Sequence, residues 1–255
     1  MKIEKPLISL ITVSYNSERT IKDTIESILN QTYDHIEYII VDGFSKDNTV
    51  EIVKSYETKM NERGFKYKII SEKDKGLYDA MNKGLNMAEG KIIGILNSDD
   101  YYINELVIEK VVNRMISKKA DCLYGDLLYV DQTDTTNIVR KWRVKNGNFR
   151  LGWNPPHPTT FLTNSIYEKV GQYKIDYKIS SDYDLLYRAI YKEKCRVEYL
   201  PEYIVKMRTG GKSTSGIKSK IVGSKEVYTT LKEHKQKFKI SIVLLRLLLK
   251  LKQFV

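Results

Sequence analysis

The first hundred residues alternate between short apolar runs and longer segments that carry an apolar residue every three or four positions. The short runs are typical of strands buried on both faces, and the longer segments are typical of amphipathic helices. This alternation predicts an α/β fold, in which helices cover both faces of a mostly parallel sheet. Strands are expected at residues 7–13, 36–41, 67–70 and 91–96.

Each of these expected strands ends in polar or turn-forming residues. Because the carboxyl ends of parallel strands meet at one edge of a sheet, the four ends predict a single ligand-binding crevice. Ser17, which lies beyond the first strand, is expected as the N-cap of the following helix. The polar ends are residues 14–16, 42–43, 71–74 and 97–100.

The second half of the chain is more mixed. Strand-like patterns cover residues 121–131, 137–144 and 196–207. A helix with an acidic first turn is expected from about Ser180, where the helix dipole favours negative charge. With 42% hydrophobic residues, 255 residues suffice for one large core. We therefore divide the chain into an α/β domain at residues 1–217 and a helical tail at residues 218–255.

The excess positive charge lies near the carboxyl end. Of 43 Lys and Arg residues and 32 Asp and Glu residues, thirteen basic but only two acidic ones fall within residues 206–255. The last segment has an apolar stripe at helical spacing, which favours a helix lying in the interface of an anionic membrane. A helix packed on the α/β domain or on a second subunit, as in a homodimer, is the alternative. The stripe is Ile240, Val243, Leu244, Leu247, Leu248 and Leu251, with Lys239, Arg246, Lys250 and Lys252 around it.

Several classes of protein do not fit this composition. No run approaches the roughly 20 apolar residues that span a bilayer, and the amino terminus lacks a signal-peptide pattern, so a soluble or peripheral protein is expected. Cys122 and Cys195 lie far apart without ligand spacing, which argues against a disulfide scaffold or a zinc site and favours a reducing compartment. Nucleic acid is not an expected partner, because the tail has aliphatic residues where a stacking platform needs aromatic ones.

Two adjacent carboxylates, Asp99 and Asp100, follow the fourth expected strand. Like charges this close disfavour each other's ionisation unless a cation lies nearby or both are solvated in a turn. Carboxylate oxygens together with diphosphate oxygens form a coordination shell that Mg²⁺ and Mn²⁺ accept. The pair is therefore a candidate metal site, with a solvated turn as the alternative.

The chain resembles the family 2 glycosyltransferases of the GT-A fold over about residues 7–215. The segments that carry the resemblance are ITVSYNSERTIKDTIESILNQTY, YIIVDGFSKDNTVEIV, SEKDKGLYDAMNKGLNMAEGKIIGILNSDDYY and SSDYDLLYRA. It implies a Rossmann-like GT-A sheet and inverting transfer of a hexose or N-acetylhexosamine from a UDP-sugar. The members it resembles most build bacterial O-antigen, capsule or other surface polysaccharide. They imply a lipid-diphosphate-linked saccharide acceptor and a cytoplasmic enzyme at the inner face of the plasma membrane.

The resemblance also assigns residues to the donor side. Asp42 is expected to hydrogen-bond the base, with a plain turn residue as the alternative, and Lys83 is expected near phosphate. For Lys83, an ordinary ion pair with Asp79 on a solvated helix face is the alternative. The donor-side residues implied by the resemblance are Ser14, Tyr15, Asp42, Asp74, Asn82 and Lys83.

NSDD matches the DxD region of the family. Asn97 stands where the first aspartate is common, so an amide would contact the ribose without adding charge. Asp99, and after it Asp100, would bind Mn²⁺ or Mg²⁺. In SSDYDLLYRA, Asp182 aligns with the general base that takes the proton of the acceptor hydroxyl. Asp184, in the same first helical turn, is the other acid that the dipole would favour there.

Two further segments match acceptor and phosphate regions. GWNPPHPTTF resembles the acceptor-side loop, so Trp153 is expected to contact the acceptor and His157 to contact the acceptor or phosphate. For His157, a packed or capping residue is the alternative. RTGGKSTSG is not a P-loop, because Lys206 stands where that motif needs glycine. We expect instead a glycine-rich loop with Arg208 and Lys212 as phosphate contacts. A nucleotidyltransferase is the alternative function, although the first strand is followed by SYNSERT and not by the basic, glycine-rich loop of that class.

Overall fold

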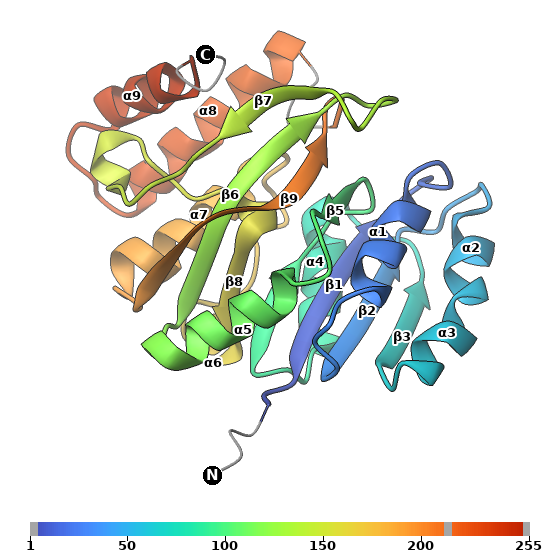
Figure 1. The fold of residues 1–255 in the computed structure, drawn as a ribbon. Helices are drawn as coiled ribbons and strands as arrows, with labels where there is room; N and C mark the ends of the chain where they lie inside the picture. The colour runs from blue at the N-terminus through green and yellow to red at the C-terminus, as the bar shows by residue number, and fades with distance from the viewer. Residues whose placement is uncertain (1–4, 212–215, 252–255) are drawn as a thin grey trace.

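The computed structural model describes residues 5–211 and 216–251. Within these residues, nine strands form one sheet (Figure 1). The strands are β1 (Ile8–Ser14), β2 (Ile36–Asp42), β3 (Lys66–Ser71), β4 (Ile92–Ile95), β5 (Asp100–Tyr102), β6 (Cys122–Val130), β7 (Ile138–Trp142), β8 (Thr160–Thr163) and β9 (Val197–Arg208). Their order is β3-β2-β1-β4-β8-β6-β9-β5, and β7 pairs with the later part of β6, beyond the end of β8.

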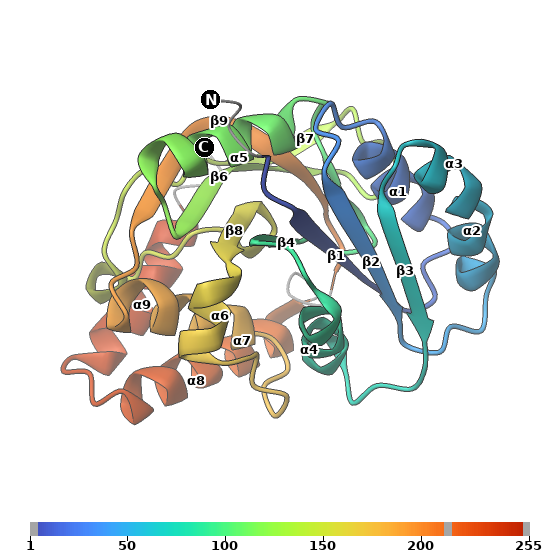
Figure 2. The same ribbon diagram turned by 90° about the horizontal axis from the view of Figure 1, so that it is seen from below.

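Helices cover both faces of this sheet. They are α1 (Ile21–Leu29), α2 (Thr49–Ser55), α3 (Glu57–Glu62), α4 (Leu77–Met87), α5 (Val107–Lys118), α6 (Asn164–Val170), α7 (Ser181–Leu186), α8 (Gly216–Glu233) and α9 (Lys239–Leu251). A π-helical stretch, η3 (Tyr187–Lys192), extends α7, and two short 3₁₀ turns are η1 (Phe149–Leu151) and η2 (His157–Thr159). Figure 2 shows α1, α2 and α3 on one side of β1–β3 and α4 on the other.

The strands β1 and β2 separate two hydrophobic cores. Because side chains alternate along a strand, Ile8 and Leu10 face the core built with α1, α2 and α5, whereas Ile11 and Val13 face the core built with α4 and α7. Every residue of both strands is buried. Full burial of one such side chain contributes about 1.5–3 kcal/mol. The parallel pairing of β3, β2, β1 and β4 confirms the predicted fold class.

Among the strands that extend this sheet, the sequence pattern predicted β6, β7 and β9 but not β8 or β5. β8 inserts antiparallel between β4 and β6. The chain does not form a solvated turn after Asp99, because Asp100 begins β5 and pairs with Met207 of β9. Asp100 is consequently 1% exposed. A three-residue strand gives almost no periodicity, so its position depends on its partner strand and not on its own sequence.

Of the two helices of the basic tail, α8 packs against α7 and α9 packs against α8 (Figure 1). The helix α9 also contacts η1. Val227 and Leu231 of α8 and Ile242 of α9 are buried in the same core as α4 and α7. Most of the apolar stripe expected in α9 does not join them, since Ile240 and Leu244 are more than half exposed. In the part of the chain that the structure describes, no helix combines the length and the apolar character needed to cross a membrane.

Candidate active site

A cleft of about 780 Å³ opens at the carboxyl ends of the parallel strands. Their register brings these ends together: Ser14 lies beside Asp42, and the N–H of Leu96 donates to the carbonyl oxygen of Ile11. The expected site residues that line the cleft are Ser14, Tyr15, Asp74, Asn97, Asp99, His157 and Asp182. Those described residues that do not line it are Asp42, Asn82, Lys83, Asp100, Trp153 and Arg208, and Lys212 lies outside the described residues.

One end of the cleft combines an exposed ring with a carboxylate. Tyr15 and Asp74 approach the backbone of Gly43 so closely that a Cβ atom there would lie 2.4 Å from Oδ2 of Asp74. The other oxygen of Asp74 accepts a hydrogen bond of 2.8 Å from the N–H of Gly76. An exposed aromatic ring can stack on a nucleobase, and a fixed carboxylate beside it can accept a hydrogen bond from that base.

Asp42 lies at the end of β2 and is almost fully buried. Its Oδ1 accepts from the hydroxyl of Ser14 at 3.1 Å, and its Oδ2 accepts from the N–H of Ser45 at 2.9 Å and the hydroxyl of Ser71 at 2.7 Å. These bonds connect the ends of β1, β2 and β3. The carboxylate therefore holds the floor of the site together, because its oxygens are occupied by protein donors.

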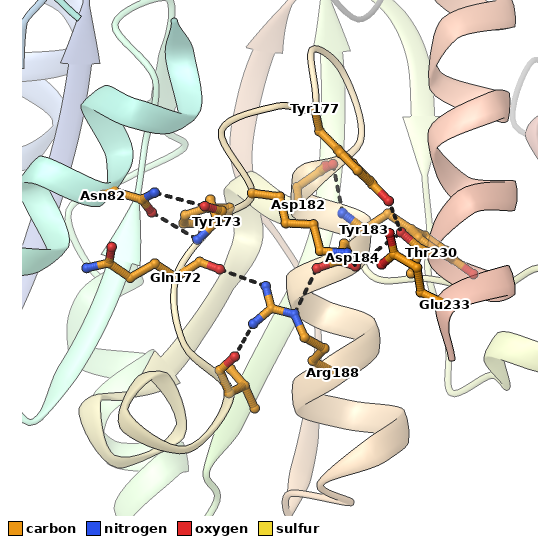
Figure 3. Close-up of polar contacts among 12 residues, drawn as sticks. Asn82, Gln172, Tyr173, Tyr177, Asp182, Tyr183, Asp184, Arg188, Thr230 and Glu233 are labelled. Atoms are coloured by element: carbon orange, nitrogen blue, oxygen red, sulfur yellow. Dashed lines mark hydrogen bonds and ion pairs between the residues drawn. The ribbon is translucent and has the colours of Figure 1, made fainter. Parts of the chain in front are cut away.

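Asn82 and Lys83 fix α4 to its surroundings. The side-chain amide of Asn82 donates to the carbonyl oxygen of Tyr173 at 2.8 Å and accepts from its N–H at 2.9 Å (Figure 3). Lys83 forms an ion pair with Glu72 at 2.8 Å and lies 3.9 Å from Asp79. Both side chains are thus engaged by protein groups.

The NSDD segment places one carboxylate in the cleft and one beneath it. Asp99 lines the cleft, and Asp100 is buried in the sheet. The amide of Asn97 donates to Oδ2 of Asp100 at 3.2 Å. Two oxygens of this segment, Oδ1 of Asn97 and Oδ1 of Asp100, are buried and have no hydrogen-bond partner among the described residues. Buried acceptors without a donor are costly, so this site favours a bound cation or donor.

Both carboxyl groups of the NSDD segment have a raised pKa. Burial raises the pKa of Asp99 and, together with the nearby charge of Asp99, raises the pKa of Asp100 well above its usual range. The guanidinium of Arg208 opposes both pKa shifts. It donates to the carbonyl oxygen of Asp99 at 2.8 Å and forms an ion pair with Asp23 of α1. Arg208 therefore supports the segment from behind the cleft.

These residues fit a divalent cation whose shell is completed by a ligand. In residues 5–211 and 216–251 no group of three or more His, Cys, Asp or Glu side chains is arranged to hold a metal. Mg²⁺ is commonly held by one or two carboxylates together with phosphate oxygens and water. Asn97, Asp99 and Asp100 offer an incomplete oxygen set of that kind, with two acceptors unsatisfied.

The two carboxylates of α7 have opposite surroundings. Asp182 lines the cleft, whereas Asp184 is completely buried. Asp184 accepts from Arg188 at 2.8 Å and from Thr230 of α8 at 3.2 Å (Figure 3). It also forms an ion pair of 2.9 Å with Lys174. Asp184 is therefore a structural acid, and Asp182 is the one that a ligand can reach.

His157 and Trp153 come from the same loop but lie in different places. His157 lines the cleft, and its Nε2 is 2.7 Å from the hydroxyl of Tyr173. Burial lowers the pKa of His157, and the charge of Asp182 partly offsets that effect. The indole N–H of Trp153 donates to the carbonyl oxygen of Val144 at 3.1 Å, and its ring packs in an aromatic cluster. Trp153 thereby shapes the loop without lining the cleft.

The cleft also contains residues that the sequence did not single out. Arg19, Lys73 and Lys178 line it and bring positive charge to a site rich in carboxylates. Ser17 lines it too, and its hydroxyl lies 2.8 Å from that of Ser98. The expectation that Ser17 caps a helix is wrong, because α1 begins at Ile21. The sequence did hold a signal for the three cations, namely their positions. Arg19 and Lys73 lie within the segments that carry the resemblance, and Lys178 lies two residues before another of them.

Comparison with known sequences identifies one family. The family described as Glycosyl transferase family 2 matches residues 9–175. An uncharacterized glycosyltransferase of Methanocaldococcus jannaschii is 28% identical over 246 residues, which are 91% of this chain and 81% of that protein. TuaG of Bacillus subtilis, named as a teichuronic acid biosynthesis glycosyltransferase, is 40% identical over 114 residues. That match covers 45% of this chain and 44% of TuaG.

Solved structures share the fold. The crystal structure of Staphylococcus aureus TarS residues 1–349 in complex with UDP-GlcNAc has a TM-score of 0.72 at 20% identity, covering 89% of this chain and 66% of that one. The mannosyltransferase PcManGT of Pyrobaculum calidifontis, in complex with GDP-Man and Mn²⁺, has a TM-score of 0.70 at 17% identity, covering 94% and 69%. These likenesses confirm the predicted GT-A architecture.

The contrast between the two acids of α7 can be tested by stability. Asp184→Ala is expected to lower the free energy of unfolding by about 3 kcal/mol, because Arg188 and Lys174 lose their buried partner. Asp182→Ala, the same change two residues earlier, is expected to change it by less than about 1 kcal/mol. Urea unfolding followed by circular dichroism measures both. Equal losses would contradict the assignment of Asp184 as the structural acid.

Proposed function

This chain belongs to glycosyl transferase family 2 and is a glycosyltransferase, and we propose that it is an inverting enzyme that uses a UDP-sugar. The transferred group is a hexose or N-acetylhexosamine, and the acceptor is a hydroxyl of a lipid-linked saccharide in the assembly of surface polysaccharide. The observation that carries the proposal is that Asp182 opens into the same cleft as Tyr15, Asp74 and Asp99. The complex of TarS with UDP-GlcNAc supports the choice of donor, and the name of TuaG supports the pathway class.

The donor would lie along the ends of the first strands. Tyr15 offers a face for the uracil and Asp74 an acceptor beside it, while the amide of Asn97 is suited to the ribose. The cations of Arg19 and Lys73 offset the charge of the diphosphate. Asp99 and Asp100 would hold Mn²⁺ or Mg²⁺, and the complex of PcManGT with Mn²⁺ supports this assignment. Such an ion supplies positive charge where the diphosphate leaves.

Asp182 acts as the general base. Its carboxylate takes the proton of the acceptor hydroxyl as that oxygen attacks the anomeric carbon from the face opposite UDP, so the anomeric configuration inverts. The nearby His157 has a lowered pKa and is neutral near pH 7. A neutral imidazole does not bind Asp182 in a fixed ion pair, which leaves the carboxylate available for the proton.

The donor and metal assignments are tested by nucleotide release. A panel of UDP-sugars and GDP-sugars is incubated with the protein, first with Mn²⁺ or Mg²⁺ and then with excess chelator. We expect release of UDP from one donor only with metal, because the leaving diphosphate needs a cation. Asp99→Asn should raise the metal concentration that UDP release needs by about tenfold. Release of GDP alone would overturn the UDP assignment, and equal rates with chelator would overturn the metal assignment.

The role of Asp182 is tested by Asp182→Asn, which keeps the shape but removes the base. Transfer is expected to fall by about 10²–10⁴-fold. UDP affinity, measured by calorimetry, should change less than about threefold, because the base contacts the acceptor and not the nucleotide. Asp176→Asn is the matched control, since this exposed carboxylate lies six residues earlier. Unchanged transfer by Asp182→Asn would remove this residue from the mechanism.

The outer face of α9 supports attachment to the inner face of the plasma membrane. Ile240, Leu244 and Leu248 are 66%, 55% and 57% exposed, and Phe238, just before α9, is 78% exposed. Lys235 and Lys237 are exposed at the same end. An aliphatic face flanked by lysines is complementary to a bilayer that contains anionic lipid.

Arg246, on the inner side of α9, does not contribute to that face. Its Nε donates to the side-chain oxygen of Asn154 at 3.0 Å, and its guanidinium lies over the ring of Tyr183. The helix is therefore oriented by contacts on one side, with its aliphatic residues on the other.

Vesicle co-sedimentation tests the membrane face. Vesicles of phosphatidylglycerol and phosphatidylcholine are expected to bind the protein, and the double variant Leu244→Glu, Leu248→Glu is expected to bind at least about tenfold more weakly. Ile116→Glu, at an exposed apolar position of α5, is the control. Unchanged vesicle binding by the double variant would refute the assignment. If size-exclusion chromatography instead shows a dimer that the double variant disrupts, the face belongs to a second copy of the chain.

A further inference from the structure

The segment just before α7 forms one side of the cleft. Lys178 and Ile179 line the cleft, and Ser180 is the N-cap residue of α7. Residues 177–180 lie outside the helices and strands. We refer to them as the strap. Because a loop has no regular hydrogen-bond ladder of its own, its backbone N–H groups need partners from elsewhere.

Glu226 of α8 supplies those partners. Its Oε1 accepts from the N–H of Lys178 at 2.7 Å, and its Oε2 accepts from the N–H groups of Ile179 at 3.0 Å and Ser180 at 2.8 Å. One carboxylate thus binds three consecutive backbone donors of the strap. Hydrogen bonds to a charged acceptor are about twice as strong as neutral ones, so this contact is a firm one.

Two further contacts hold the strap against the same helix. The hydroxyl of Ser180 donates to the carbonyl oxygen of Gly223 at 3.1 Å, and the hydroxyl of Tyr177 lies 3.2 Å from that of Thr230. A Cβ atom at Gly223 would lie 3.0 Å from Cγ2 of Ile179. The absence of a side chain at this position lets α8 approach closely enough for Glu226 to reach.

The strap leads directly to Asp182. The N–H of Asp184 donates to the carbonyl oxygen of Ser180 at 3.2 Å, so the strap begins the first turn of α7, and Asp182 is the second residue of that helix. The direction in which Asp182 enters the cleft is therefore set by the backbone that Glu226 holds. In a group-transfer reaction, a displacement of about 1 Å can lower the rate about 10²-fold.

We infer that Glu226 is a positioning residue, which acts on the reaction by holding the strap and, through it, Asp182. The inference rests on the proposed role of Asp182 as the base. It makes α8, in the basic carboxyl-terminal part of the chain, a structural part of the active site. Only a carboxylate suits the position, because an amide would turn an N–H donor toward the N–H groups of the strap.

The test compares Glu226→Gln with Glu233→Gln. Glu233 lies two turns later on α8, is about half exposed and pairs with Lys174, so it controls for loss of a carboxylate from this helix. Glu226→Gln is expected to lower kcat for transfer by about 10–10²-fold while the KM for the donor changes less than about threefold. Glu226→Asp should recover part of the rate, and Glu233→Gln should retain the wild-type rate.

Two measurements separate positioning from general instability. UDP-binding stoichiometry by calorimetry should stay near one per chain in Glu226→Gln, whereas a partly unfolded variant would lose stoichiometry in proportion to kcat. In the Asp182→Asn background, Glu226→Gln should cause little further loss, because both changes remove the same function. A wild-type rate for Glu226→Gln, or fully additive losses, would overturn the inference. If Asp182→Asn alone retains transfer, the proposed base is wrong irrespective of the behaviour of Glu226→Gln.

Discussion

The burial of both faces of β1 and β2 is the constraint on which the rest of the structure depends. A polar side chain inside these strands needs a buried partner, as Glu37 does with Ser9 and Lys68. Polar groups meant for a ligand are therefore confined to the strand ends. The parallel register brings those ends to one edge, where Ser14 and Asp42 lie side by side. The position of the cleft is thus a consequence of how the sheet is covered.

The carboxylates of the site divide into two groups according to their partners. Asp42, Asp184 and Glu226 have their oxygens occupied by protein donors, and they hold strand ends, helix α7 and the strap in place. Asp99 and Asp182 open into the cleft. The acids of the first group fix the elements around the cleft, and the proposed positioning of a donor and an acceptor by the second group depends on such rigidity.

The carboxyl-terminal helices join this arrangement through one face each. Val227 and Leu231 of α8 complete the core beside α7, and Ile242 of α9 extends it. The other side of α9 carries exposed aliphatic residues. Because the same pair of helices supports the segment before Asp182 and presents the proposed membrane face, their apolar pattern serves packing on one side and surface attachment on the other.

The sequence by itself determined the alternation of strands and helices, and with it the edge where a ligand binds, because hydrophobic periodicity depends on neighbours along the chain. It also placed Asp99 and Asp182 among the candidates. Only the tertiary structure decided which candidates face the cleft. Asn82 is engaged by Tyr173 and Arg208 by Asp23, and such partners lie many residues away. Burial and hydrogen bonding depend on contacts across the fold, so a local pattern cannot distinguish a side chain that binds a ligand from one that binds the protein.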